Sequence, residues 1–145
     1  IISTNVLREF DKVFQDKDVV CVTSFIRPIP NTFNNRVPVF FINKMTHLSS
    51  RLGKALATTV CIAYRKDAFS ATGGFNKNLS SGEDIDLSLR ISRLGKLVFV
   101  KNVWAETSMR RIEIWGLPYF TYRYFKGYIM GKVQKKPDIY EPVRV

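Results

Sequence analysis

The chain has 145 residues, of which 46% are hydrophobic, and it carries a formal net charge of +11 at pH 7. This length supports one hydrophobic core and one domain at most. Two cysteines and one histidine are too few for a structural zinc site, because tetrahedral zinc takes four nitrogen or sulfur ligands. The sequence also lacks an uncharged apolar run of about 18 residues, which argues against a membrane-spanning helix.

The positive charge is concentrated late in the chain. Residues 96–145 contain ten Lys or Arg against four Asp or Glu, so more than half of the net charge lies in this segment. Such a balance suits nucleic acid, an anionic membrane surface or a phosphorylated substrate, and charge alone does not select one of them. The first residue is Ile1, and no signal-peptide pattern follows it, so we expect a processed or shortened form of a longer protein.

The first half of the chain predicts two helices and two strands. Apolar side chains recur with a helical period over residues 5–16 and 39–52, and β-branched, apolar runs occupy residues 19–26 and 58–64. The first strand is expected to stop at Pro28, with a polar loop over residues 31–36.

The second half continues the alternation. Its expected helices are residues 66–72, 83–94 and 110–131, and its expected strand is residues 97–100. We expect Gly73-Gly74 and Gly95 to end the first two of these helices, residues 116–118 to interrupt the third, and residues 135–145 to form a loosely held tail. Helices alternating with short apolar strands predict an α/β fold, with a sheet flanked by helices.

The two cysteines are expected to be buried free thiols. Cys21 and Cys61 each lie inside an apolar, β-branched run, which favours thiols in strands over a disulfide.

Three carboxylates crowd the first turn of the helix predicted over residues 83–94. Glu83, Asp84 and Asp86 follow a loop rich in glycine and serine, and acids at this place complement the helix dipole. Asp86 and Arg90 are spaced to form a surface ion pair of little energetic weight.

Helix geometry separates the three acids. At 100° per residue the side chains of Leu87, Ile91 and Leu94 form one stripe toward the core, with Glu83 and Asp84 on its margins and Asp86 further toward solvent. Asp84 therefore suits either of two roles, a simple N-terminal cap or a general base at the edge of a cleft.

Four segments together resemble family 2 glycosyltransferases, which have the GT-A fold. They are residues 59–69, the Gly-Gly-Phe turn at 73–75, the helix start at 82–90, and residues 95–100. Each segment alone is weak evidence, and the resemblance lies in the order and spacing of the four segments. It implies that residues 1–112 are the C-terminal, acceptor-side portion of a GT-A (Rossmann-like) domain with a mixed sheet flanked by helices. Residues 113–145 would then form an aromatic, basic C-terminal helix and tail.

The resemblance assigns roles to particular residues. Asp84 matches the catalytic base that deprotonates the attacking acceptor hydroxyl, and Glu83 matches a supporting or acceptor-binding acid. Gly73, Gly74 and Phe75 match the turn that borders the sugar and acceptor, where paired glycines let backbone amides approach a ligand. A plain helix C-cap explains the same glycines, and both roles are compatible.

Two further basic residues match a phosphate-binding stretch. Thr107-Ser108-Met109-Arg110-Arg111 resembles the Thr-Ser-x-Arg-Arg sequence of nonprocessive family members, which implies that Arg110 and Arg111 hold the donor diphosphate. The alternative is a basic helix start on the surface.

The resemblance also implies a missing half. Family members carry an upstream nucleotide-binding half that ends in an Asp-x-Asp metal motif, and this motif is expected upstream of Ile1. Mg²⁺ or Mn²⁺ would thus serve the full-length enzyme, with none bound by this chain alone, which is expected to be inactive. His47 is expected to be a structural histidine, and Glu106 lies nearer to the place of a late metal ligand.

Residues 114–130 combine seven aromatic side chains with Arg123 and Lys126. This mixture suits contact with an anionic membrane interface, or packing against the rest of the protein.

The resemblance implies a nucleotide-sugar donor and a saccharide or lipid-linked acceptor, at a cytoplasmic location with peripheral membrane contact and no nucleic acid. The alternatives are a basic, non-catalytic module that binds anionic membrane or nucleic acid, and a catalytically dead scaffold. An incomplete sheet with an open strand edge further predicts self-association.

Overall fold

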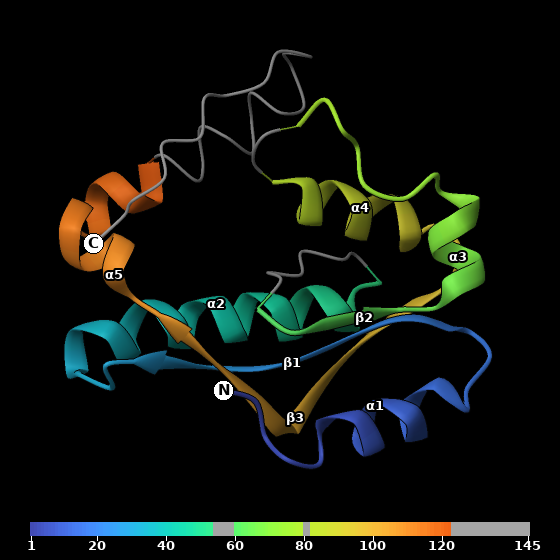
Figure 1. Ribbon diagram of the computed structural model, residues 1–145, viewed down its shortest axis with the longest axis horizontal. Helices are drawn as coiled ribbons and strands as arrows, with labels where there is room; N and C mark the ends of the chain where they lie inside the picture. Colours follow the sequence, from blue (N-terminus) through green and yellow to red (C-terminus); the bar gives the residue numbers. More distant parts are fainter. Residues whose placement is uncertain (54–59, 80–81, 123–145) are drawn as a thin grey trace.

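The computed structural model describes residues 1–53, 60–79 and 82–122 (Figure 1). Its helices are α1 (Val6–Phe14), α2 (Phe33–Arg51), α3 (Lys66–Ala71), α4 (Glu83–Ile91) and α5 (Arg110–Trp115), and its strands are β1 (Val19–Ile29), β2 (Ile62–Tyr64) and β3 (Lys96–Ser108). The predictions for 123–145, which include most of the aromatic segment and the tail, lie outside the described residues.

The three described strands form one mixed sheet in the order β2-β1-β3. The central strand β1 pairs antiparallel with β2 and parallel with β3, with Cys21 opposite Tyr64 on one side and opposite Leu97 on the other. The α/β class and the mixed sheet flanked by helices, both predicted from the sequence, are therefore confirmed. Both thiols are free, as expected, with Cys21 buried and Cys61 half-buried.

Helices cover both faces of the sheet (Figure 1). α1 packs on one face through Val6 and Phe10. On the other face α3 and α4 form a core through Ala68, Leu87 and Ile91. A third cluster joins the end of β1 to α2 and to the segment that holds α5; its buried members are Ile26, Val39, Met109 and Ile112.

Several predicted boundaries were wrong. β1 runs past Pro28 to Ile29, although a proline was expected to end it. β2 covers β1 only as far as Thr23, so at Pro28 the β2 side of β1 is an edge, where a missing N–H disrupts no ladder. α4 ends at Ile91, so Leu94 is 52% exposed instead of joining the predicted core stripe of Leu87 and Ile91.

Gly95 has a different role from the one predicted. It lies beyond the end of α4, and a Cβ atom there would collide with the carbonyl oxygen of Asp18 and lie 2.6 Å from Cγ1 of Val20. The glycine is required because the chain passes against the start of β1 on its way into β3.

α2 begins at Phe33, six residues before its predicted start, and contains Pro38. The inner face of this helix is mostly polar; its buried residues are Asn35, Pro38, Val39, Asn43, Thr46 and Ser49. Apolar periodicity could not locate a helix whose buried face carries amides and hydroxyls, and this explains the misplaced boundary.

The amide of Asn43 replaces a missing strand. It accepts a hydrogen bond from the N–H of Ile26 and donates one to the carbonyl oxygen of Ile26, both at 2.9 Å. β2 has ended by this point, so the side chain satisfies the two backbone groups that a neighbouring strand would otherwise pair. Asn43 is 5% exposed, and water therefore offers little replacement.

The outer edge of β3 is partly covered. Near the N-terminus Ser3 donates its N–H to the carbonyl oxygen of Trp104, and Glu106 donates its N–H to that of Ile1, at 2.9 and 2.8 Å. Residues 1–3 therefore shield this stretch of the edge, which weakens the basis for the predicted self-association. The oligomeric state itself stays a prediction.

Replacing Asn43 by alanine should destabilise the protein by about 2–4 kcal/mol, because two buried backbone groups lose their partners. Asn43→Asp should cost at least as much as alanine at neutral pH, since a buried carboxylate would set a charged oxygen against the Ile26 carbonyl, to which it cannot donate. Urea denaturation followed by circular dichroism measures both. Asn34→Ala, at an exposed position of the same helix, is the matched control and should change the stability little. Equal effects at 43 and 34 would contradict the role given to Asn43.

Candidate functional site

The predicted acids lie at the start of α4, as expected. Gly82 precedes the helix with a left-handed φ of 74°, and Glu83 is exposed whereas Asp84 is half-buried. Oδ1 of Asp84 accepts a hydrogen bond from the N–H of Ile85 at 2.8 Å. The buried side chains of Leu87 and Ile91 fix the helix to the sheet, so Asp84 is carried by a rigid element.

The sequence predicted that Asp86 points toward solvent, and this was wrong. Asp86 belongs to a hydrogen-bond network that joins α4 to the glycine turn. Its Oδ2 accepts hydrogen bonds from Nε and Nη2 of Arg90 at 2.9 and 2.8 Å. The same guanidinium donates to the carbonyl oxygens of Thr72 at 2.6 Å and Gly74 at 2.8 Å. The expected surface pair is therefore half-buried, and it holds residues 72–74 against α4.

The turn at Gly73-Gly74 has left-handed backbone at both glycines, with φ of 74° and 70°. Gly74 is buried, and a Cβ atom there would lie 3.1 Å from the ring of Phe69. Gly73 has open space around its Cβ position. The turn ends α3, as the capping interpretation predicted, and Gly74 also lets the chain pass close to an aromatic ring.

An aromatic cluster lies beside this turn. The ring centroids of Tyr64, Phe69 and Phe75 are 5.7 to 6.5 Å apart, and two of the three pairs meet edge to face. Phe75, which the resemblance placed near the acceptor, is 47% exposed. It therefore presents an apolar surface at the turn instead of filling the core.

Tyr64 connects this cluster to the first turn of α4. Its hydroxyl lies 3.1 Å from Oγ of Ser88, which is one turn after Asp84 on the same helical face. Burial raises the pKa of Tyr64; the hydrogen bond with Ser88 opposes this rise, and the negative charge of Asp84 adds to it. Tyr64 thus contacts Phe75 and, through Ser88, the helix that carries Asp84. Sequence reasoning missed Tyr64 and Ser88, because neither residue type is diagnostic in isolation.

Arg110 and Arg111 belong to another part of the fold. They begin α5, which packs on α2 and the end of β1 through Met109 and Ile112, whereas α4 packs on the first half of β1 through Leu87 and Ile91. Arg110 is exposed and Arg111 is half-buried. In Figure 1 the N-terminal end of α4 is directed toward the side of the molecule that carries α5.

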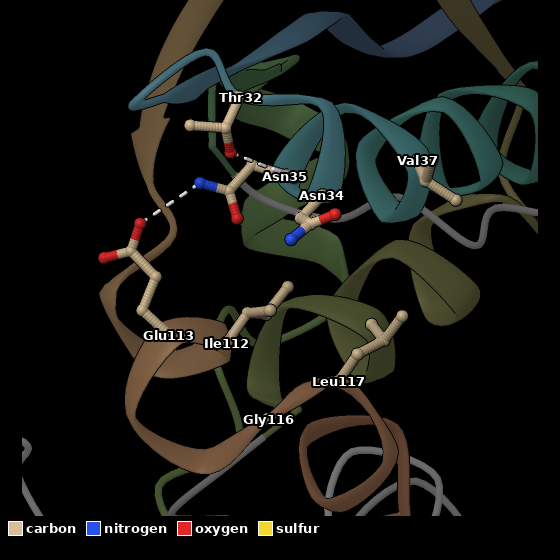
Figure 2. Close-up of a pocket in the computed structure, with 8 residues that line it drawn as sticks. All are labelled: Thr32, Asn34, Asn35, Val37, Ile112, Glu113, Gly116 and Leu117. Carbon is tan, nitrogen blue, oxygen red and sulfur yellow. Dashed lines mark hydrogen bonds between the residues drawn. The ribbon is translucent and has the colours of Figure 1, made fainter.

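A hollow of about 540 Å³ lies between the start of α2 and α5 (Figure 2). Asn35 donates from Nδ2 to Oε1 of Glu113 at 3.2 Å and to the carbonyl oxygen of Pro30 at 3.0 Å. Polar groups of Asn34 and Glu113 and apolar groups of Ile112 and Leu117 also line the hollow. Its size is within the range of small-molecule sites. Sequence patterns did not predict this hollow, because residues 31–36 were expected to form a loop.

The described acids do not fit a divalent metal. Across residues 1–53, 60–79 and 82–122, no group of three His, Cys, Asp or Glu side chains is arranged to hold an ion. In the Asp-x-Asp triplet at 84–86, Asp86 pairs with Arg90. In the triplet at 16–18, Nζ of Lys96 lies 3.4 Å from Oδ2 of Asp16 and 3.0 Å from Oδ2 of Asp18. His47 packs on the ring of Phe99 at 5.7 Å.

Comparison with known proteins adds no assignment. No protein-family model matches this chain, and neither a curated protein nor a solved structure matches it significantly.

Changing Arg90 to lysine should release the glycine turn, because an ammonium group cannot reach the carboxylate and two carbonyls together. We expect a loss of about 2–3 kcal/mol in stability, from charge-assisted hydrogen bonds that are partly exposed. Amide hydrogen exchange should quicken at residues 72–76 while the centre of β1 stays protected.

The matched control is Arg93→Lys, at an exposed position just after α4. Unchanged exchange at residues 72–76 in Arg90→Lys would show that the turn holds its shape without this tie.

Proposed function

We propose that this chain is the acceptor-side portion of an inverting glycosyltransferase, which transfers a sugar from a nucleotide-sugar donor to an acceptor hydroxyl. The observation that supports this most is the joint placement of a half-buried Asp84, a glycine turn and an aromatic cluster around one rigid helix start. The order of the sequence motifs, which resembles family 2 glycosyltransferases, supports the same function. Saccharides and lipid-linked alcohols or phosphates are the acceptor classes that the resemblance implies.

In this proposal Asp84 is the general base. Its carboxylate accepts the proton of the acceptor hydroxyl as the oxygen attacks the anomeric carbon of the donor sugar. The new bond forms on the face opposite the leaving nucleotide diphosphate, the old carbon–oxygen bond breaks, and the configuration inverts. A correctly placed base contributes about 10²- to 10⁴-fold to the rate.

The surroundings of Asp84 suit this role. One carboxylate oxygen, Oδ1, is held by the N–H of Ile85, which orients the group on a helix anchored in the core. A second acid, Glu83, is adjacent and exposed, where it would contact acceptor hydroxyls. Phe75 offers an exposed ring on which the apolar face of a sugar would pack.

The donor side of the site is proposed to depend on residues beyond this chain. Arg110 and Arg111 would bind the diphosphate, since guanidinium groups pair well with phosphate oxygens. A divalent metal belongs to the upstream half that the resemblance implies, and no step is assigned to it here.

Asp84→Asn should lower turnover at least about 100-fold while the donor KM changes less than about twofold, because the base acts only in the transition state. The assay uses the chain extended by its upstream half, with UDP- and GDP-sugars, and follows nucleotide release.

Asp67→Asn is a matched control, because Asp67 lies in the first turn of α3 and accepts from the N–H of Ala68 at 2.8 Å, the same local bond as in Asp84. If Asp84 were only a helix cap, both variants would lose similar stability and neither would lose turnover. Wild-type turnover in Asp84→Asn would remove it from the base role.

A further inference from the structure

The outer face of α2 carries a continuous apolar stripe. Its exposed side chains are Phe33, Val37, Phe40, Phe41, Met45, Leu48 and, just after the helix, Leu52. At 100° per residue they span about 140° of the helix circumference, opposite the buried polar residues. Phe33 is 79% exposed and Phe41 is 61% exposed, so the stripe is open to solvent along the whole helix.

This arrangement reverses the usual orientation of an amphipathic helix. The side chains that α2 buries include Asn35, Asn43, Thr46 and Ser49, whereas most of its aromatic and large aliphatic side chains are exposed. Leaving large apolar groups in water forgoes about 1.5–3 kcal/mol for each side chain that burial would stabilise. Apolar patches of this extent mark interaction surfaces.

The charged residues of α2 are all basic. α2 contains Arg36, Lys44 and Arg51 and no acidic residue. Lys44 and Arg51 project from the same arc as the apolar side chains, and Nζ of Lys44 lies 5.5 Å from the ring centroid of Phe40. His47, on the same helix, has its pKa lowered by partial burial first and then by the positive charges of Lys101, Arg51 and Lys44.

The segment beside the start of α2 extends the surface. Residues 110–122 pack on α2 through Ile112, and they expose Ile114, Leu117, Tyr119 and Tyr122. Exposed apolar side chains therefore occur on both of these adjacent segments, and Figure 1 shows α2 running beside β1.

We propose that the outer face of α2 docks on an anionic lipid bilayer, with its aromatic and aliphatic side chains in the interface and its cations at the lipid phosphates. A long helix with an apolar face, basic margins and no acids fits this surface in both polarity and charge. None of the helices in the described part of the chain is long and apolar enough to cross a bilayer. A symmetric second copy fits less well, because it would bring Lys44 and Arg51 of both copies together.

The test is cosedimentation of the 145-residue chain with vesicles of neutral phosphatidylcholine, and with vesicles that contain 30 mol% phosphatidylserine. The wild-type chain should bind the anionic vesicles at least about tenfold more tightly, and about 0.5 M salt should remove most of this preference. Phe40→Gln/Phe41→Gln should weaken binding at least about tenfold through lost apolar burial. In Lys44→Gln/Arg51→Gln the affinity for anionic vesicles should fall about fivefold for each charge removed, and the preference for phosphatidylserine should disappear.

The matched control is Leu7→Gln, on the opposite face of the sheet, where Leu7 is 78% exposed. It should bind as the wild type does, and circular dichroism should show all variants folded, since every changed side chain is exposed.

No binding to anionic vesicles, or equal binding by the Phe40/Phe41 variant, would overturn the proposal. A wild-type dimer in light scattering that the Phe40/Phe41 variant converts to monomer would assign the face to a second copy instead. Phe-dependent binding of a single-stranded oligonucleotide without vesicle binding would assign it to nucleic acid.

Discussion

The arrangement of the candidate site depends on the guanidinium group of Arg90. It pairs with the carboxylate of Asp86 in its own helix and donates to the carbonyls of Thr72 and Gly74 in the preceding turn. Backbone carbonyls in a left-handed turn have no helix or strand partner, so a planar cation with several donors is well suited to them. One side chain thereby fixes how the glycine turn and its aromatic neighbours face the acids at the start of α4. Without this tie, Asp84 would still begin a helix, but the turn would lose its hydrogen bonds to α4.

In the central strand, too, side chains pair with several backbone groups. Within the part of the chain that the structure describes, β1 has neighbouring strands on both sides only over its first half, and side chains and loops complete its second half. Arg65 donates to the carbonyls of Phe14, Asp16 and Val19 where α1 enters β1, and Asn43 pairs both polar groups of Ile26 further along. A small mixed sheet is thus extended by polar side chains that satisfy buried backbone groups. This use of α2 turns its polar side inward and leaves its apolar side outward.

Sequence patterns predicted the elements whose inner face is apolar. α1 and α4 were located because their apolar positions recur at helical spacing, and α3 was located by the glycines that end it. The place of Asp84 at the start of α4 followed from the pattern of that helix. α2 was predicted too short, because Pro38 and an amide-rich inner face hide its period. The role of Arg90 could not be predicted, because two of its three partners are backbone carbonyls whose positions only the fold defines. The hollow at Asn35 and Glu113 joins residues 78 positions apart, which local patterns do not connect.

The inverted polarity of α2 also has a consequence for sequence variation. In an ordinary surface helix, inward positions tolerate exchange among aliphatic residues and outward positions accept polar ones. Here the inward positions of Asn43, Thr46 and Ser49 should reject aliphatic replacements, while the outward phenylalanines contribute little to folding. A saturation scan scored for folding alone would therefore show α2 as a helix whose constrained positions are polar. Any selection that keeps its outward positions apolar must act on something other than the stability of the fold.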